Sequence, residues 1–348
     1  MTIYDIAREA GVSPATVSRV LTGNARVSPE KRARVESLLE KHNFQPNELA
    51  RSLVRSRTKS IGLLIADVQN EYYSSLFRAC SRAAEERGYS LMVANGFSEL
   101  DAEYHALTRF EEQQMDVIAV IGGMVDRIEP PEGFVERLEQ LRKRIPVLVL
   151  GEVENCSCPS IRLNDRSAMK DIMDHLAKMG NRRCAIIGGM KEVRSTLEKN
   201  RQFRELSSEY GFELHEEYIG NWSDYTIEGA FLAAEIFFEK LRKKSVPFPE
   251  AFVTINDLTA AGVLHYCHMH GIRVPEDISL VSFDNTSFSR VLSPPLSSVD
   301  YGYDDYGTLI ADTAIRLAEN KEVPLVQEIE TRLVVRISSG YQRNTHVE

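Results

Sequence analysis

The chain has 348 residues, of which 43% are hydrophobic, and this length predicts two or three domains with sizeable cores. Residues 1–60 hold 11 Lys and Arg against 6 Asp and Glu, so they carry +5, and the rest carries −14 of the net charge of −9. A basic segment joined to an acidic body indicates an N-terminal unit that binds a polyanion.

The cysteines and the apolar runs exclude other classes of protein. Five cysteines, two of them at Cys156 and Cys158, do not make a disulfide framework, and no apolar leader precedes Thr2. The apolar runs are far shorter than the roughly 20 residues that cross a bilayer. We therefore expect a protein of the reducing cytoplasm that does not insert into a membrane.

The first 45 residues predict three short helices. Thr2 and Asp5 match a capping box at the start of the first helix, and Gly11 supplies its stop. A serine-proline start signal at 28–29 opens the third helix, whose apolar residues can close over the first two.

The second of these helices carries the candidate chemistry. Ser13 can cap it, Pro14 suits its first position, and Val17 and Val20 form an apolar face. Two short helices joined by a tight turn form a helix-turn-helix, whose second helix enters the major groove of DNA. Arg19, on the polar side, can contact guanine O6 and N7 together. A three-helix bundle with a solvated polar face is the alternative.

Residues 45–60 form a basic linker with helical potential. They contain few apolar side chains, and isolated helices shorter than about 12 to 15 residues are marginal in water.

After Ile61 the pattern alternates between strands and helices. Apolar runs such as IGLLIA, DVIAVI and ISLVSF are separated by amphipathic helices. Such runs predict parallel sheets covered by helices on both faces, and their number predicts two sheets. We expect a boundary at 160–164 and a return crossing near 290. Ligands of open parallel sheets bind beyond the carboxyl ends of the strands, so the residues after each run are candidates.

This chain resembles the lactose/galactose repressor (LacI/GalR) family of bacterial transcriptional regulators. Three stretches resemble the DNA-binding headpiece and hinge of that family: TIYDIAREAGVSPATVSRVLTG, VSPEKRARV and FQPNELARSL. Three further stretches resemble the family's body: INDLTAAG, VPEDISLVSFDN and PPLSSVD. The resemblance implies an all-α helix-turn-helix headpiece and an α/β body of two doubly wound parallel-sheet lobes, like periplasmic binding proteins. The implied domains are a headpiece at 1–45, a hinge at 46–60 and a body at 61–340, with an N-lobe at about 61–162 and 291–322 and a C-lobe at about 163–290 and 323–340.

For the complex with double-stranded operator DNA, the resemblance implies contacts from the recognition helix and the hinge. Leu53 matches a leucine that the family wedges between bases in the minor groove, although ordinary packing against the body is the alternative. Pro14 has neither a donor nor an acceptor in its side chain, so the operator sequence stays open. The predicted DNA-binding residues are Thr2, Tyr4, Ser13, Pro14, Ala15, Thr16, Ser18, Arg19, Thr22, Asn47, Ala50, Arg51 and Leu53.

The resemblance also implies a small-molecule effector between the lobes. Carboxylates and amides pair with hydroxyls, and aromatic rings cover a pyranose, so we expect a sugar or a sugar derivative. Helix capping is the alternative for Asp257 and Asp284, and a core or hinge position for Trp222. The predicted effector-binding residues are Asp67, Asn70, Tyr72, Tyr73, Lys199, Trp222, Asn256, Asp257 and Asp284.

Several positions depart from the family pattern and put a common neutral hexose in doubt. Lys199 and Gln202 stand where the family usually has an arginine and a glycine, and lysine donates as a point charge rather than as a planar fork. Arg201 could replace that arginine if the helix register shifts. Ser282 and Glu71 replace a usual glycine and a usual proline.

No catalytic, cofactor or metal site is expected. His265 and His268 are spaced to share a metal, but His270 diverges from them on a helix. The glycine pairs at 122–123 and 188–189 are not phosphate-binding loops, and no Ser-His-Asp or Cys-His spacing is evident.

The sequence therefore predicts a homodimeric, ligand-responsive regulator, a repressor of carbohydrate-utilisation genes on a pseudo-palindromic operator. One alternative is a global carbon-catabolite regulator that uses a phosphoprotein corepressor. The other is a solute-binding protein for sugar transport, which would not need residues 1–60. The tail after Gly340 has no leucine heptads, so a coiled-coil tetramer is not expected.

Overall fold

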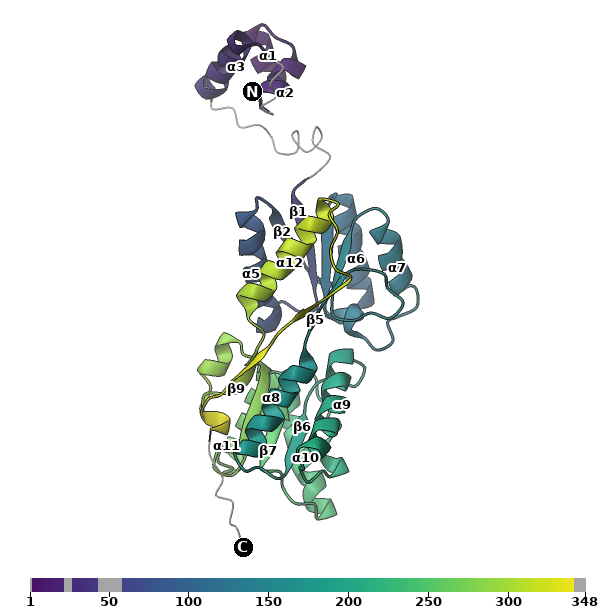
Figure 1. The fold of residues 1–348 in the computed structure, drawn as a ribbon, viewed down its shortest axis with the longest axis vertical. Coiled ribbons are helices and arrows are strands. Elements are labelled where there is room, and N and C mark those ends of the chain that lie inside the picture. Colours follow the sequence, from purple (N-terminus) through teal and green to yellow (C-terminus); the bar gives the residue numbers. More distant parts are fainter. Residues whose placement is uncertain (1, 22–26, 43–57, 341–348) are drawn as a thin grey trace. The chain divides into compact units, whose positions relative to one another are not determined.

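The computed structural model describes residues 2–21, 27–42 and 58–340, which divide into two compact units, Met1–Thr58 and Lys59–Glu348 (Figure 1). Some of the predicted DNA-binding residues lie outside the described residues: Thr22, Asn47, Ala50, Arg51 and Leu53. The DNA contacts of these five, including the Leu53 wedge, stay predictions.

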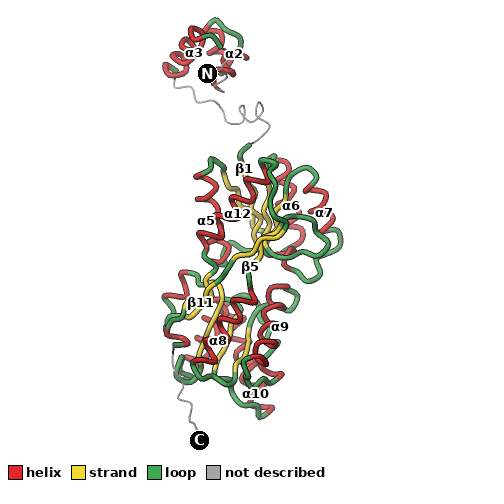
Figure 2. The backbone as a smooth tube through the Cα atoms, viewed as in Figure 1, coloured by secondary structure: helices red, strands yellow, loops and turns green. Residues whose placement is uncertain are grey.

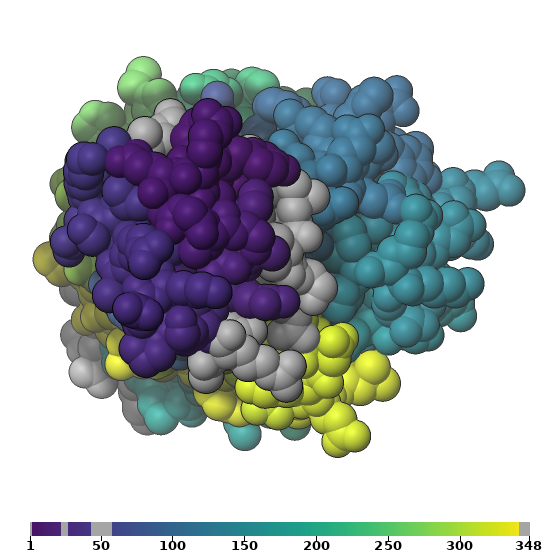
Figure 3. Space-filling model, turned by 90° about the horizontal axis from the view of Figure 1, so that it is seen from above, coloured from purple at the N-terminus to yellow at the C-terminus, as the bar shows by residue number. Residues whose placement is uncertain are grey.

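The first unit contains the three expected helices, α1 (Ile3–Ala10), α2 (Pro14–Leu21) and α3 (Pro29–Lys41). The capping box is confirmed, because Asp5 N donates to Thr2 Oγ1 and Thr2 N donates to Asp5 Oδ2. Gly11 ends α1 with a φ of 64°, in the left-handed region that glycine favours. The space-filling view shows the described headpiece residues packed together (Figure 3), and their core consists of Ile6, Ala7, Ala10, Val17, Val20, Val27 and Val35.

The second unit begins with a parallel six-stranded sheet of order β10-β5-β4-β3-β1-β2. Side chains of its central strands alternate between two apolar cores, because successive residues of a strand point to opposite faces. Helices α5 and α12 cover one face, and α6 and α7 the other (Figures 1 and 2). The elements are β1 (Ser60–Ile65), α5 (Glu71–Glu86), β2 (Ser90–Asn95), α6 (Leu100–Glu112), β3 (Val117–Ile121), η1 (Gly123–Asp126), α7 (Phe134–Arg142), β4 (Val147–Leu150), β5 (Ser160–Leu163), α12 (Tyr303–Ala318) and β10 (Val326–Ile329).

The second lobe holds a five-stranded sheet of order β11-β9-β8-β7-β6, in which only β11 is antiparallel. Helices α8 and α9 pack on one face, and α10 and α11 on the other. Among the described residues, no helix is both long and apolar enough to span a bilayer. The elements are α8 (Asp165–Lys178), β6 (Cys184–Ile187), α9 (Arg194–Glu209), η2 (Glu216–Tyr218), α10 (Ile227–Lys244), β7 (Ala251–Thr254), α11 (Asp257–Met269), β8 (Ser279–Asp284), η3 (Ser287–Arg290), β9 (Ser297–Asp300), β11 (Arg332–Val334) and η4 (Ile337–Ser339).

Two strands belong to the opposite lobe from the one that we expected. β9 pairs in parallel with β8, so it belongs to the second sheet, although we assigned 291–322 to the first lobe. β10 pairs with β5, so it belongs to the first sheet, although we assigned 323–340 to the second lobe. The apolar-run pattern misses both strands because β9 reads SSVD and β10 reads VQEI, and neither is a continuous apolar run.

Candidate functional site

The outward side of α2 is the candidate DNA interface. Val17 and Val20 are buried in the headpiece core and anchor the helix. Arg19 lies on the other side of the helix and is exposed. Its predicted neighbours in the interface are either exposed or half-buried: Ser13, Pro14, Ala15, Thr16 and Ser18.

Several hydroxyls of this predicted interface also serve the headpiece fold. Thr16 N donates to Ser13 Oγ at 3.2 Å, so Ser13 caps α2. The Thr2 hydroxyl donates to Asp5 Oδ2 at 2.8 Å. Tyr4 is 66% exposed on α1. The contacts of these residues with DNA stay predictions.

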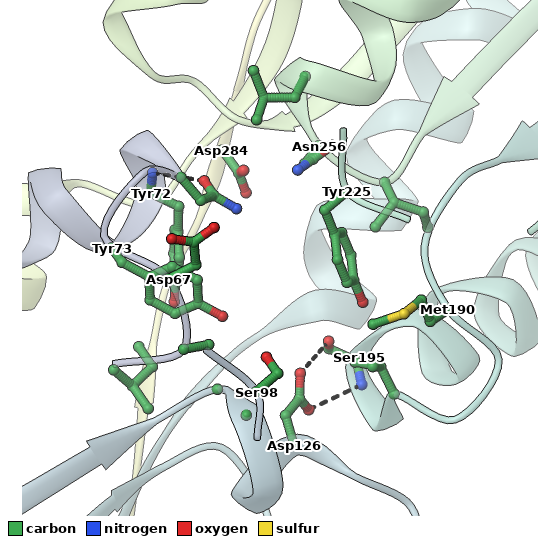
Figure 4. Close-up of a pocket in the computed structure, with 18 of the residues that line it drawn as sticks. Asp67, Tyr72, Tyr73, Ser98, Asp126, Met190, Ser195, Tyr225, Asn256 and Asp284 are labelled. Carbon is green, nitrogen blue, oxygen red and sulfur yellow. Dashed lines mark hydrogen bonds between the residues drawn. The ribbon is translucent and has the colours of Figure 1, made fainter. Parts of the chain in front are cut away.

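A cavity of about 570 Å³ lies between the two lobes of the body. It collects residues that follow strands of both sheets, as expected for open parallel sheets. Figure 4 shows Asp67, Asp126 and Asp284 around one common space. The cavity wall includes most of the predicted effector-binding residues: Asp67, Asn70, Tyr72, Tyr73, Lys199, Asn256 and Asp284.

Two amide side chains of the wall cap helices. Asn70 Oδ1 accepts from Tyr72 N at 3.0 Å, and Asn256 Oδ1 accepts from Thr259 N at 2.9 Å. Each carbonyl oxygen is therefore engaged by its own helix, which fixes the amide plane. In Figure 4 the Asn256 nitrogen is directed into the cavity, where it can donate to a ligand.

Asp284 is the most deeply buried carboxylate of the wall, at 8% exposure. Burial, followed by the nearby Asp257 carboxylate, raises its pKa well above the ordinary value, while Lys199 and a hydrogen bond from Tyr301 act in the opposite direction. Its backbone has a φ of 96°, a strained conformation at the exit of β8. A ligand that donates a hydrogen bond or carries a positive charge would therefore stabilise the ionised Asp284 carboxylate.

Lys199 faces the cavity, and its charge is already paired. Its Nζ lies 2.9 Å from Asp165 Oδ1 and 4.9 Å from the centre of the Phe283 ring. The register of α9 is not shifted toward Arg201, whose guanidinium pairs with Glu198 and Glu205 on the outer surface. Arg201 therefore does not replace the usual arginine.

The structure does not bring Trp222 and Asp257 to the cavity wall. Trp222 is 37% exposed. Asp257 is buried, and its carboxylate accepts from Thr286 N, Thr286 Oγ1 and Ser298 Oγ, each at 2.8 Å. Asp257 therefore holds in place the loop that follows β8, and Asp284 is the last residue of β8, directly before that loop.

Several residues of the wall were not predicted from the sequence: Asp126, Asp165, Ser195, Tyr225 and Tyr301. Asp126 and Asp165 could have been found, since each follows a strand of the first sheet. The glycine pair at 122–123 has positive φ values and turns the chain from β3 toward Asp126. Tyr225 lies in the loop before α10, and no sequence signal marks it.

Among the hydrogen bonds that join the lobes around the cavity are two pairs of a serine with a carboxylate. Ser195 of α9 donates to Asp126 from its amide at 3.2 Å and from its hydroxyl at 2.6 Å (Figure 4). Ser287 donates to Glu71 Oε1 from its amide at 3.1 Å and from its hydroxyl at 2.6 Å. Glu71, which replaces the usual proline, thus has an acceptor role between the lobes.

A buried carboxyl group supports the loop that carries Asp126. Met124 N donates to Glu103 Oε1 at 3.0 Å, and Glu103 is 1% exposed. Burial raises the pKa of Glu103 to about 7 from its ordinary value of 4.5. The folded protein therefore holds this proton more tightly than the unfolded chain does.

We predict that Glu103→Gln flattens part of the pH dependence of stability. Because the folded-state pKa is raised, the free energy of unfolding falls as the pH rises from about 4.5 to about 7, by up to about 3 kcal/mol. The variant should therefore melt at a higher temperature than the wild type at pH 8. Melting curves at pH 5 and pH 8 measure this, with the exposed Glu136→Gln as the control, and equal pH slopes for wild type and Glu103→Gln would contradict it.

Comparison with known proteins agrees with this architecture. The model of bacterial regulatory proteins of the lacI family matches residues 2–47, and that of the periplasmic binding protein-like domain matches residues 173–339. Catabolite control protein A of Priestia megaterium is 31% identical over 312 residues, which are 89% of this chain and 90% of that protein. The protein of the same name from Staphylococcus xylosus is 32% identical over the same shares.

Solved structures share the fold. The lac repressor dimer bound to operator and the anti-inducer ONPF has a TM-score of 0.84 at 22% identity, over 97% of this chain and 99% of that chain. The complex of the transcriptional regulator CelR with cellobiose has a TM-score of 0.70 at 22% identity, over 97% of this chain and 100% of that chain.

A helix-turn-helix headpiece joined to a two-lobed body with a cavity between its lobes defines a ligand-responsive, DNA-binding transcriptional regulator. The chain belongs to the LacI family of bacterial regulatory proteins.

Proposed function

We propose that this regulator acts in the cytoplasm as a homodimer that binds a pseudo-palindromic operator and represses carbohydrate-utilisation genes. The cavity carries the proposal, since both lobes line it and hydrogen bonds join them around it. A ligand that prefers one arrangement of the lobes shifts their equilibrium, and a coupling of about 1 to 3 kcal/mol changes operator affinity roughly 5- to 150-fold. The lac repressor dimer on its operator supports the proposal by analogy.

The charge of the cavity wall narrows the class of effector. The wall has five acidic and two basic side chains: Asp67, Asp126, Asp165, Asp284 and Glu228 against Arg127 and Lys199. Asp165 and Lys199 pair with each other, so the remaining acidic groups outnumber the remaining basic group. A phosphate or a carboxylate would enter against this field, whereas hydroxyls and amines find acceptors.

The proposed effector is therefore a sugar or sugar derivative that is neutral or bears an amine. The cavity of about 570 Å³ accommodates a mono- or disaccharide, within the usual range of ligand pockets. The cellobiose complex of CelR, a protein of the same fold, is in keeping with this size. The relatives are named as regulators, so we propose that the cavity binds its ligand rather than turns it over.

A thermal-shift panel of neutral sugars, amino sugars, sugar phosphates and uronates tests this proposal. An effector at 100 times its Kd should stabilise the folded protein by about 2.7 kcal/mol. Operator affinity is then measured with and without the ligand that stabilises. Stabilisation by phosphates or uronates alone would refute the proposed class, and a stabilising ligand that leaves operator affinity unchanged would refute its role as effector.

A carbon-catabolite regulator with a phosphoprotein corepressor is the second candidate. Identities of 31% and 32% to two proteins named catabolite control protein A favour it. A pull-down with a serine-phosphorylated carrier protein distinguishes the candidates. If only the phosphorylated carrier protein is retained and it raises operator affinity, the corepressor candidate is supported. If the carrier protein is not retained, the small-molecule effector is the supported candidate.

A further inference from the structure

Two cysteines and a glutamate converge on the first lobe, outside the effector cavity. Cys156 and Cys158 lie in the loop between β4 and β5, and Glu139 lies on α7. Their sulfur and carboxylate oxygen atoms all lie within 4.8 Å of one another. Cys158 is buried, and the other two are half-buried. None of the three lines the effector cavity.

The spacing of these atoms matches the ligands of a tetrahedral metal site. A zinc–sulfur bond of about 2.3 Å places two sulfur ligands about 3.8 Å apart across a tetrahedral ion. A cluster in which every ligand atom lies within 4.8 Å of the others reaches that geometry with small side-chain movements. Ligands within one loop and one neighbouring helix also require no movement between the lobes.

The surroundings hold Glu139 in place as metal sites usually hold their carboxylates. Its Oε1 accepts from Ser157 N at 2.6 Å, so it is tied to the amide between the two cysteines. Its Oε2 accepts from Arg142 Nε at 3.1 Å and from Arg142 Nη2 at 2.8 Å. Such outer hydrogen bonds orient ligand groups, and they leave further oxygen lone pairs for an ion.

Charge and space favour a divalent cation. Two thiolates and one carboxylate carry −3 and the Arg142 guanidinium carries +1, so a divalent ion balances the site. A pocket of about 80 Å³ adjoins both cysteines and is also lined by Ser160 and Arg162. That space is large enough for a water molecule to serve as a fourth ligand, since roughly 10 to 15 Å³ of such space holds one.

We propose that Glu139, Cys156 and Cys158 form a binding site for a thiophilic divalent cation of the Zn²⁺ class. Soft thiolate ligands select such ions over Mg²⁺ and Ca²⁺, which take oxygen ligands. This site is separate from the effector cavity, so it can exist whether or not the proposed effector class is right. A cysteine pair serving only as a disulfide would have no use for the oriented carboxylate.

Titration of the reduced, metal-free full-length protein with Co²⁺ tests the site. One equivalent per chain should produce thiolate-to-cobalt charge-transfer absorption and the intense visible bands of tetrahedral cobalt, and Zn²⁺ should displace both. Cys156→Ser and Cys158→Ser should each lose most of the charge-transfer intensity. Glu139→Gln should keep sulfur-to-cobalt absorption and bind roughly 10- to 100-fold more weakly.

The control is Glu136→Gln, an exposed position on the same helix, which should bind Co²⁺ like the wild type. Melting curves establish that each variant is folded, and if Cys158→Ser unfolds, the half-buried Cys156→Ser decides alone. Absence of charge-transfer absorption in the wild type overturns the proposal. Undiminished charge-transfer absorption in folded Cys156→Ser also overturns it, as does wild-type affinity for Co²⁺ in Glu139→Gln.

Discussion

Asp284→Asn should weaken effector binding roughly 10- to 150-fold and leave operator binding without effector unchanged. The Asp284 carboxyl is buried in the cavity wall, and hydrogen bonds to charged groups contribute about 1.5 to 3 kcal/mol. Asparagine is the appropriate replacement, because it tolerates the positive φ of 96° and has the same shape. Isothermal titration with the ligand from the thermal-shift panel and operator binding with and without it measure both parts.

The same variant should be more stable than the wild type when the cavity is empty. Burial raises the pKa of Asp284 in the folded state, so ionisation of this carboxyl lowers the free energy of unfolding as the pH rises above its unfolded-state pKa. Asparagine removes that loss. A gain in melting temperature at pH 8 together with a loss of effector affinity identifies a binding group rather than a structural one.

Effector affinity should also depend on pH if the effector bears an amine. As the pH rises through the raised pKa of Asp284, the carboxylate forms and an ammonium group binds more tightly. Asp284→Asn should lose this dependence, and the exposed Asp305→Asn should keep it. Unchanged affinity in Asp284→Asn at every pH would remove Asp284 from the effector site.

Residues whose position follows from local chemistry were predictable from the sequence. The Thr2 and Asp5 capping box and the Gly11 stop depend on neighbours in the chain, and the structure contains them as expected. Asn256 and Asp284 were predictable for a different reason. Carboxyl ends of parallel strands meet at one edge, so residues after apolar runs are brought together.

The orientation of a side chain was not predictable where it depends on partners that are distant in the chain. Asp257 and Asp284 both follow apolar runs, yet Asp257 turns to Thr286 and Ser298, which lie 29 and 41 residues away in the chain. Strand β9 carries two serines whose hydroxyls donate to Arg336 O and to Asp257 Oδ1, so its composition resembles that of a turn. Both cases are decided by tertiary packing, which a local pattern does not contain.

Arg19→Ala should lower affinity for the specific operator roughly 5- to 150-fold while non-specific DNA binding persists. A bidentate contact between arginine and guanine discriminates by about 1 to 3 kcal/mol per base pair, whereas non-specific affinity comes mainly from phosphate contacts. The variant should fold normally, since Arg19 is exposed and Val17 and Val20 hold α2 on the core. Fluorescence anisotropy at several salt concentrations measures both affinities, with an operator selected from random DNA and a scrambled duplex as the two ligands.

Arg8→Ala is the matched control, because it removes one positive charge from the same headpiece at a side chain that is 80% exposed on α1. Loss of charge alone should weaken both duplexes equally in the control, whereas loss of a base contact should weaken the operator alone. Arg19→Lys separates the two effects within one position, since lysine keeps the charge without the planar fork. If Arg19→Ala and Arg8→Ala change the ratio of specific to non-specific affinity equally, Arg19 contributes charge and does not read sequence.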